Sequence, residues 1–396
     1  MSELSYLEKL LDGVEVEWKA VGDIAGYSTT KVDADKLDAT SFVGVDNLLA
    51  DKGGRIDATY QPNTARLTAY EPGDILLGNI RPYLKKVWMA ENNGGCSGDV
   101  LAIRILADCK KIISPEYLYY ALSSDSFFSY SMQHAKGAKM PRGSKDAILN
   151  YQIPIPCPSA PEKSLAIQSE IVRILDKFTA LTAELTAELT AELNMRKKQY
   201  NYYRDQLLSF KEGEVEWKTL GEVAVIGTGN HDTQDAIEHG KYIFYARGRE
   251  PLKLNVFDFD ETAIITAGDG AGVGKVFHYA KGKYALHQRA YRIVPNAFMN
   301  PRFVYHYITA YFFTYIQKAS VSSSVTSLRR PMFLKFPIPV PPSEEQARIV
   351  EILDKFDTLT NSITEGLPRE IELRQKQYEY YRDLLFSFPK PETVSN

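Results

Sequence analysis

Apolar residues recur at helical spacing in two long segments of the chain, 171–210 and 349–388. Ile171, Ile174 and Phe178 begin one such stripe in steps of three and four residues, a spacing that places side chains on one face of an α-helix. Proline, serine and acidic residues precede both segments, and these are the usual signals for the start of a helix. We therefore expect two long helices whose apolar stripes are most simply buried against each other.

The second helical segment departs from the first at NSITEGLPREI, residues 361–371. Gly366 and Pro368 stand in the middle of this stretch, and a proline inside a helix costs about 3 kcal/mol. We expect the two segments to be equal in length, with a kink or break in the second.

The regions 25–150 and 225–335 follow a different pattern. Short β-rich runs separated by Gly and Asn turns predict strands at 74–80, 85–90, 263–268 and 284–294. Mixed apolar and polar stretches predict helices at 115–124 and 301–317. Each region is therefore expected to be a compact domain, and the fold class is mixed α/β.

The chain also contains an internal duplication. Residues 171–210 align with 349–388 without a gap and 23 of the 40 positions are identical, so the helical segments are copies of one unit. Further matches pair IPIPCPS (153–159) with FPIPVPPS (336–343), GVEVEWKAVGDIA (13–25) with GEVEWKTLGEVA (213–224), and LSYLEKLLDG (4–13) with the end of the repeated helix. The matched segments follow a circular order, because the N-terminal segment 4–13 corresponds to the end of a repeated helix.

This order predicts four parts in the chain. We expect a globular domain at 1–155, a helical spacer at 156–212, a second globular domain at 213–341 and a second helical spacer at 342–396. The two globular regions are unlike in sequence but occupy matching positions, which predicts a pseudo-twofold arrangement of two related halves.

The net charge of –3 does not by itself favour nucleic acid, but the distribution of charge is uneven. Residues 270–343 contain ten Lys and Arg residues without a single Asp or Glu, and 126–145 is a shorter acid-free window with four basic residues. Such stretches make positive surfaces, whose commonest partner is a phosphate backbone. The alternative is a chance cluster of charges on a solvated face.

The sequence shows no signal peptide and no apolar run long enough for a membrane span, which predicts a soluble cytoplasmic protein without a membrane partner. Its three cysteines lack a CxxC pair and favour neither disulfides nor zinc. The six histidines form no metal-binding spacing, so no metal site is expected.

Catalytic motifs are also missing from the sequence. ITAGDGAGVGK (265–275) resembles a phosphate-binding P-loop, but Asp269 replaces its first glycine and Val276 its hydroxyl residue. A strand-like segment follows where the P-loop needs a helix, so a glycine-rich turn between strands is expected. GxGxxG, GxSxG and the Asn-Pro-Pro-aromatic signature of adenine methylases do not occur. A nucleotide-hydrolysing enzyme using Lys275 remains the alternative.

Hydrogen-bonding side chains on loops are the chemically informative feature. Arginine can bind guanine with two hydrogen bonds and glutamine can bind adenine, while Ser, Thr and Lys commonly contact phosphates. For each such residue the alternative is an ordinary solvated side chain. The candidate DNA-binding residues are Lys136, Lys139, Arg142, Ser144, Lys145, His287, Gln288, Arg289, Arg292, Ser322, Ser323, Ser324, Arg329 and Arg330.

The duplicated arrangement, in which a Pro-Ile-Pro segment precedes a long helix ending in QY·YYRD·L·SF, resembles the specificity subunits of Type I restriction–modification enzymes. Three consecutive TAEL copies at 182–193 resemble the IC branch of that family. The resemblance covers the whole chain in its organisation. It is most specific in the two helical segments.

The resemblance implies a non-catalytic, sequence-specific DNA-binding subunit. Each globular domain would be a target recognition domain for one half of a bipartite site, and the helices would form an antiparallel coiled coil that spaces the domains. Two modification subunits with S-adenosylmethionine and two motor–nuclease subunits with ATP and Mg would join the chain, which itself binds no cofactor. Spacing and docking would involve Leu181, Leu185, Leu189, Leu193, Tyr200, Tyr203, Tyr378 and Tyr381. The alternative is a coiled-coil scaffold whose basic domains bind nucleic acid without sequence preference.

The TAEL copies suggest a more specific role. The apolar spacing in the first helical segment changes from alternating threes and fours to consecutive fours, which locally unwinds a coiled coil. One copy adds about 6 Å of rise and about 40° of rotation, whereas one DNA base pair adds about 3.4 Å and about 35°. We predict that each copy changes the gap between the half-sites by about one base pair.

Overall fold

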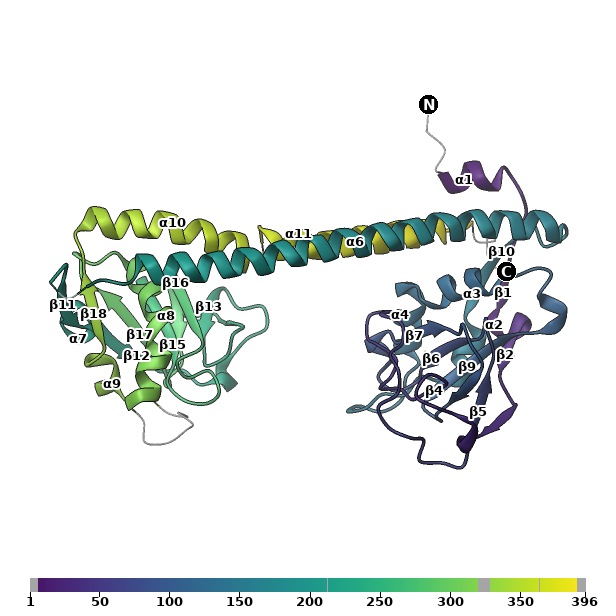
Figure 1. The fold of residues 1–396 in the computed structure, drawn as a ribbon. Helices are drawn as coiled ribbons and strands as arrows, with labels where there is room; N and C mark the ends of the chain where they lie inside the picture. Colours follow the sequence, from purple (N-terminus) through teal and green to yellow (C-terminus); the bar gives the residue numbers. More distant parts are fainter. Residues whose placement is uncertain (1–5, 212, 320–327, 363, 390–396) are drawn as a thin grey trace. The chain divides into compact units, whose positions relative to one another are not determined.

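A computed structural model describes residues 6–211, 213–319, 328–362 and 364–389. The chain divides into two compact units: unit 1 comprises Met1–Ala187 and Glu372–Asn396, and unit 2 comprises Glu188–Ile371. Each unit combines one globular region with helix segments from both copies of the repeat (Figure 1). Within the described ranges, no helix is long and apolar enough to cross a membrane.

Unit 1 contains two four-stranded sheets. The first has the order β2-β9-β6-β7, from Ala25–Tyr27, Val100–Ile105, Ile75–Gly78 and Val87–Met89, and all its neighbours are antiparallel. The second has the order β3-β5-β8-β4, from Lys31–Asp33, Arg66–Tyr70, Gly94–Cys96 and Phe42–Val43. The shorter helices of unit 1 are α1 (Tyr6–Leu11), α2 (Val21–Ile24), α3 (Pro115–Leu122), α4 (Asp125–Gln133) and α5 (Lys145–Asn150), with 3-10 turns at Ala34–Lys36, Pro82–Leu84 and Ala107–Cys109.

Unit 2 is built on a six-stranded sheet. Its order is β12-β17-β15-β16-β13-β14, from Ala224–Thr228, Ala290–Pro295, Phe259–Ala267, Phe277–Leu286, Tyr242–Tyr245 and Leu252–Leu254. Helix α8 (Pro301–Ala319) packs against the sheet through buried residues such as Phe303 and Ile308. The shorter elements are α7 (Leu220–Val223), α9 (Arg330–Leu334) and a 3-10 turn at Thr233–Asp235.

The two globular regions share the order of four sheet strands and a two-stranded ribbon despite their different sequences. Four strands of each main sheet follow one order: the first strand lies beside the last, and the last lies beside an antiparallel pair, so that β2-β9-β6-β7 corresponds to β12-β17-β15-β16. A two-stranded ribbon accompanies each sheet, namely β1 (Val16–Ala20) with β10 (Gln152–Pro156) and β11 (Glu216–Thr219) with β18 (Pro337–Val340). The registers agree, since Trp18 faces Pro154 and Trp217 faces Pro339. The duplication therefore extends into the globular regions.

A buried glutamine connects each globular region to its long helix. Gln168 is fully buried; its side-chain oxygen accepts from the Ser114 amide at 3.0 Å and its nitrogen donates to the Ile112 carbonyl at 2.7 Å. Gln346 makes the corresponding bonds to the Asn300 amide at 2.7 Å and the Phe298 carbonyl at 3.2 Å. Because each glutamine satisfies backbone groups at the start of α3 or α8, the helix and the domain are fixed to each other.

The first helical segment is one continuous helix, α6 (Pro161–Leu207), whereas the second is divided into α10 (Ser343–Asn361) and α11 (Leu367–Leu385) (Figure 1). This confirms the predicted break. Gly366 has φ +83°, and a Cβ at that position would lie 2.5 Å from the Thr358 carbonyl oxygen. Pro368 stands in the first turn of α11, where its missing N–H costs no helical bond.

Each unit contains a pair of packed helix segments, as predicted. In unit 1 the ring of Phe178 on α6 stacks on Tyr381 of α11 at 5.3 Å, and Thr179 lies 2.8 Å from the Tyr378 hydroxyl. Residue numbers rise on one helix as they fall on the other, so the segments are antiparallel. In unit 2 Tyr203 of α6 stacks on Phe356 of α10 at 5.5 Å. Phe356 is the repeat equivalent of Phe178, and Tyr203 is the equivalent of Tyr381, so both units contain the same contact.

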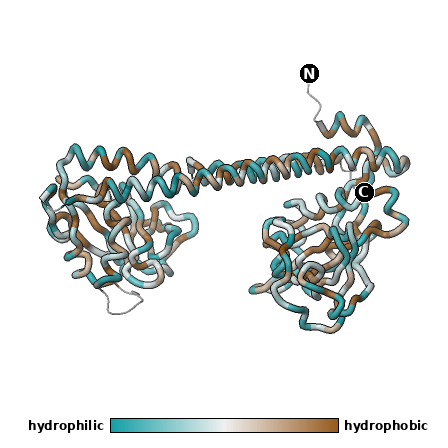
Figure 2. Tube along the Cα trace, viewed as in Figure 1, coloured by the Kyte–Doolittle hydropathy of each residue, from teal (hydrophilic) through white to brown (hydrophobic). Residues whose placement is uncertain are grey.

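The core of each globular region includes the end of a repeated helix. Leu385 and Phe388 belong to the core of unit 1, and Leu208 is buried in unit 2 with Phe210 packed beside it. Figure 2 shows brown and teal alternating along the helices, as expected for helices with one buried face.

One expected strand is wrong, and one leucine of the TAEL region is exposed. The run at 284–294 is not a single strand, because it contains the end of β16, a turn at 287–289 and β17. Backbone bonds from neighbouring strands hold this turn. Leu181 is 51 % exposed and lies outside the buried stripe, whereas Leu175 is fully buried. Burial on α6 follows its contacts with the globular region rather than an uninterrupted leucine series.

Candidate nucleic-acid interface

Five connections of unit 2 meet in one place, which we call the unit 2 loop cluster; it comprises residues 231–232, 247–248, 268–269, 287–289 and 328–329. Backbone hydrogen bonds hold it together. The His287 amide donates to the Tyr245 carbonyl at 3.0 Å and the Gln288 amide to the His231 carbonyl at 2.9 Å. The Gly268 amide donates to the Arg289 carbonyl at 2.8 Å. The turn that carries His287, Gln288 and Arg289 is thus fixed from three sides.

Asp269 binds two arginines in this cluster. Its Oδ1 accepts from Arg247 Nη1 at 3.0 Å and its Oδ2 from Arg289 Nη1 at 3.1 Å. Burial raises the pKa of Asp269, but the hydrogen bonds from the two guanidinium groups outweigh it and leave that pKa below its ordinary value. The Arg289 side chain is 63 % exposed and therefore has free donors facing solvent.

Gln288 is held by a second carboxylate. Its Nε2 donates to Asp232 Oδ2 at 3.0 Å. Hydrogen bonds from Gln288 and Thr233 lower the pKa of Asp232, so this acceptor is ionised at neutral pH. Gln288 itself is exposed, with its amide oriented by the aspartate.

His287 is 1 % exposed and supports the turn from inside. Its Nδ1 accepts from the Arg289 amide at 2.9 Å, and its ring stacks on Phe244 at 6.4 Å. Burial, followed by the charge of Arg247, lowers the pKa of His287 and favours the neutral ring. Because Nδ1 accepts a hydrogen bond, the neutral ring carries its proton on Nε2. This position gives His287 a structural role in presenting Gln288 and Arg289.

The other candidates in unit 2 lie at different places. Arg292 is on β17, where Nη1 donates to Glu261 Oε1 at 2.8 Å and the guanidinium stacks 4.2 Å from the Phe259 ring centre. It is therefore engaged within the sheet. Arg329 precedes α9 in the loop cluster, Arg330 begins α9, and both are exposed. Ser322, Ser323 and Ser324 lie outside the described residues.

Unit 1 has a corresponding unit 1 loop cluster, which comprises residues 79–81, 99 and 136–143. The amides and carbonyls of Lys136 and Arg142 bond reciprocally at 2.9 Å and close a hairpin. Lys139 is exposed at its tip. Arg142 donates to Asp99 at 2.5 Å and is 56 % exposed. This hairpin presents three basic side chains to solvent.

Ser144 and Lys145 begin the helix that follows the hairpin. The Ser144 hydroxyl accepts from the Ala147 amide at 3.3 Å, which caps α5. The Lys145 ammonium lies 5.8 Å from the Tyr27 ring centre, and the Tyr27 hydroxyl donates to the Lys145 carbonyl at 2.8 Å. Ser144 is committed to the helix cap, whereas the exposed Lys145 ammonium could still approach a phosphate.

The two loop clusters occupy the same place in the shared topology. The Gly143 amide donates to the Asn79 carbonyl, as the Leu328 amide donates to Gly268. The Asn79 amide in turn donates to the Asp99 carbonyl, as the Gly268 amide donates to Arg289. An aspartate and an arginine thus stand at equivalent positions, so the two clusters present different chemistry on one framework.

Sequence reasoning missed several residues of the clusters. Arg81 has φ 53°, an uncommon left-handed conformation for a residue other than glycine, and its amide donates to the Pro141 carbonyl at 2.7 Å. Arg247, Asp232 and Asp269 were missed because they lie outside the acid-free windows. The positive φ of Arg81 could not be read from sequence, and the carboxylates became relevant only through their arginine and glutamine partners.

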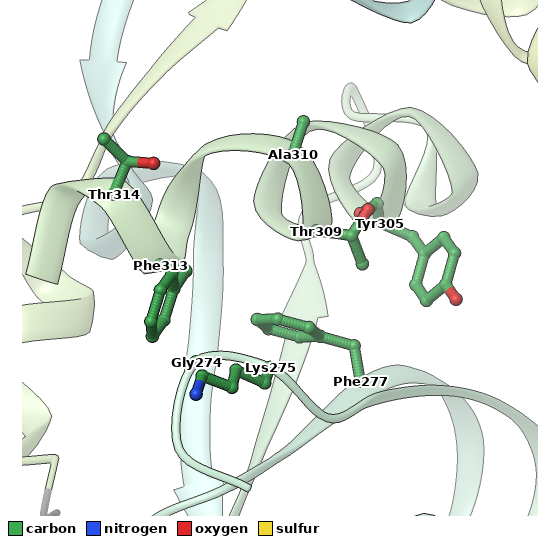
Figure 3. A pocket seen from close by; sticks show the side chains of 8 residues that line it. All are labelled: Gly274, Lys275, Phe277, Tyr305, Thr309, Ala310, Phe313 and Thr314. Carbon is green, nitrogen blue, oxygen red and sulfur yellow. The ribbon is translucent and has the colours of Figure 1, made fainter. Parts of the chain in front are cut away.

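The glycine-rich stretch around Lys275 is a turn between β15 and β16, as predicted. Lys275 lies beside α8 at a cavity of about 410 Å³, with its ammonium 5.0 Å from the Phe313 ring centre (Figure 3). Because β16 follows where a P-loop requires a helix, this lysine lacks the phosphate-binding setting. Among the described residues, no group of three His, Cys, Asp or Glu side chains could hold a metal ion.

The predicted spacing and docking residues fall into two groups. Leu185, Leu189 and Leu193 are partly buried on α6. Tyr200 and Tyr378 are also partly buried, while Tyr203 and Tyr381 are 44 % and 36 % exposed beyond their stacked faces. The exposed tyrosines lie at equivalent positions of the two repeats.

Duplicated domains that present different basic loop clusters at equivalent positions are the arrangement expected of a protein that contacts nucleic acid at two places. Residues 72–195 and 212–373 match the family model described as the Type I restriction modification DNA specificity domain. The chain therefore belongs to the family of Type I restriction–modification specificity subunits, which are sequence-reading and non-catalytic.

Relatives extend the match over the whole chain. The chain is 43 % identical to the Escherichia coli Type I restriction enzyme EcoR124I/EcoR124II specificity subunit, with 100 % of each chain covered. It is 37 % identical to the E. coli EcoprrI specificity subunit, over 92 % of this chain and 93 % of the other. A solved structure concerning assembly of the type I R-M system has a TM-score of 0.62 at 18 % identity, covering 94 % and 97 % of the two chains, which supports the fold.

Proposed function

We propose that this subunit directs a Type I restriction–modification complex to a bipartite DNA site, with each loop cluster reading one half. The observation that carries the proposal is the equivalence of the two clusters in backbone position combined with their different side chains. Equivalent placement suits two half-sites of one duplex, and different side chains suit two different base sequences.

Membership of the family supports a proposal about the partners. We propose that two modification subunits carrying S-adenosylmethionine and two motor–nuclease subunits using ATP and Mg assemble on this chain in the cytoplasm. The exposed Tyr203 and Tyr381 are candidate docking residues, because their stacked rings stand on packed helices at equivalent positions of the repeats. Aromatic side chains that are only partly covered are common anchors in protein interfaces.

The test is a map of methylated adenines in DNA from cells that carry the complete system. Wild type should give one bipartite sequence. Arg289→Ala should relax or weaken only the half-site of unit 2, by about 1–3 kcal/mol if its contact is to a base. Arg329→Ala should affect that same half-site, and Arg142→Ala the half-site of unit 1.

Lys335→Ala provides a control, because Lys335 is an exposed basic residue of unit 2 outside the loop cluster. It should leave both half-sites unchanged. Methylation without sequence preference would favour the non-specific scaffold and contradict the proposal. Simultaneous relaxation of both half-sites by Arg289→Ala would contradict the assignment of one domain to each half-site.

We further propose that the TAEL copy number sets the gap between the half-sites. The copies lie inside the continuous helix α6, so removing one shortens the helix by about 6 Å and rotates its C-terminal part by about 40°. Deleting residues 186–189 should shorten the gap by about one base pair without changing the bases read. An unchanged gap, or an altered half-site, in the methylation map would refute this.

A further inference from the structure

We propose that Asp232 and Asp269 are positioning residues that aim Gln288 and Arg289 at DNA, so that unit 2 reads one adenine and one guanine in the major groove. The inference deepens the proposed function and rests on it. It concerns residues that contact the readers and need not contact DNA themselves.

The argument for adenine begins with the orientation of the Gln288 amide. An ionised carboxylate can only accept hydrogen bonds, so Asp232 selects the amide orientation in which Nε2 faces it. The amide keeps its oxygen and one remaining N–H for another partner. An adjacent acceptor and donor match the N6 amino group and N7 of adenine. Without Asp232 the amide could turn over and lose this preference.

The argument for guanine begins with the two hydrogen bonds that the Asp269 carboxylate accepts. Each oxygen accepts one N–H from a different arginine, Arg247 or Arg289. A guanidinium has five N–H donors in a planar fork, so Arg289 retains a further donor edge after this bond. Two such donors match O6 and N7 of guanine. Arg289 is the more exposed arginine, at 63 % against 39 % for Arg247.

The backbone around the readers is fixed in advance. His287 is buried beneath the turn, and its Nδ1 accepts from the Arg289 amide. The backbone amide of Gln288 and the backbone carbonyl of Arg289 form hydrogen bonds with two other connections of the cluster. The two side chains are therefore displayed from a rigid turn, and the remaining freedom lies in the rotamers that the two aspartates restrict.

The positioning role of the two carboxylates also predicts an effect on DNA binding that a role in fold stability alone would not. Negative groups beside a DNA-binding surface oppose the phosphates, so they weaken binding to any sequence. Removing their charge should therefore retain or increase affinity for scrambled duplex DNA while base discrimination falls. Simple destabilisation would instead lower both affinity and discrimination.

The experiment uses the complete complex with Asp232→Asn, Asp269→Asn and, as a control, Glu261→Gln. Glu261 accepts from Arg292 within the sheet, so its variant preserves the loop cluster. In maps of methylated adenines, Asp232→Asn should remove the preference for adenine at one position of the unit 2 half-site. Asp269→Asn should remove the preference for guanine at one position of the same half-site. Loss of a bidentate contact corresponds to roughly 5- to 150-fold lower discrimination. Affinity for a scrambled duplex should be unchanged or higher.

Gln288→Met keeps both carboxylates and covers the case in which an aspartate variant does not fold. It should degenerate the adenine position alone. Absence of a guanine, or of any adenine besides the methylated one, from the wild-type unit 2 half-site would overturn the inference, as would unchanged maps for Asp232→Asn, Asp269→Asn or Gln288→Met. A wild-type complex that methylates without sequence preference would instead overturn the proposed function. The two failures are thus distinguishable.

Discussion

At the scale of single residues, Gln168 and Gln346 show how the duplicated sequence fixes each domain to its helix. Both are buried, and each satisfies an amide and a carbonyl at the start of a domain helix. A buried backbone group without a partner costs about 1–3 kcal/mol. The presence of a glutamine in both repeats therefore has a physical reason that the sequence context does not reveal.

Gln346→Leu should lower the free energy of unfolding of unit 2 by at least about 1–3 kcal/mol, because the Asn300 amide and Phe298 carbonyl lose their partner. Denaturant unfolding of the full chain measures the change. Gln206→Leu is the control, since Gln206 is exposed near the end of α6. Equal stability of Gln346→Leu and wild type would contradict the anchoring role.

At the scale of elements, the two helix ends are fixed to their domains by different chemistry. Arg382 on α11 is 1 % exposed and contacts Asp125 of α4 and Glu379, which also bind Lys52. Its counterpart in the first repeat, Arg204, is 24 % exposed and bonds to the neighbouring Asp205. Equivalent arginines of the two repeats thus differ: Arg382 is buried among charges of unit 1, whereas Arg204 has a local partner.

The buried charges predict a pH dependence. Burial, followed by repulsion from Arg382, lowers the pKa of Lys52 to about 8, whereas its ordinary value is 10.5. Between these values the unfolded chain binds more protons than the folded chain, so stability contributed at Lys52 rises as pH increases from 8 towards 10.5 and is constant below 8.

The difference in melting temperature between wild type and Lys52→Met should therefore shift in favour of wild type as pH rises through this window. Calorimetry at several pH values provides the measurement. Lys111→Met, at an exposed position of unit 1, should run parallel to wild type. Parallel curves for Lys52→Met would show that Lys52 has an ordinary pKa in the folded chain.

At the scale of the whole molecule, the chain is organised as two units whose contacts follow a circular order. In unit 2 the end of α6 continues through the chain into β11. In unit 1 the end of α11 takes the equivalent place, and the Trp18 indole on β1 donates to the Pro389 carbonyl at 2.9 Å. Unit 1 is thus completed by residues from both ends of the sequence.

A circular permutant that joins Asn396 to Met1 and opens after Lys211 should fold and methylate the same bipartite sequence, because it opens only the Lys211–Glu214 turn and keeps the packed contacts of both units. A permutant opened inside α6 after Glu188 should lose activity, since it interrupts the continuous helix. Methylation maps and thermal unfolding test both. A changed target sequence in the first permutant would contradict the circular arrangement.

The sequence predicted the long helices, the break at Gly366, the mixed α/β domains and the duplication. Repeated sequence segments such as IVRILDKF and IVEILDKF can be recognised without a structure. The spacing of apolar residues indicates which face of a helix is buried. Arg142, Gln288 and Arg289 also lie within the basic windows, and the structure places all three exposed in the loop clusters. These features are local, since each depends on residues that are close together along the chain.

Only the tertiary structure decided which residues meet. The common topology of the two globular regions was invisible, because a backbone framework constrains hydrogen-bonding positions without requiring similar side chains. Asp269 acquired its place between Arg247 and Arg289 through strands that are distant in sequence. Likewise, only the structure shows that Arg292 donates to Glu261 within the sheet and that His287 is buried beneath its turn. Sequence determined the elements and their repetition, whereas packing determined which side chains are available to a partner.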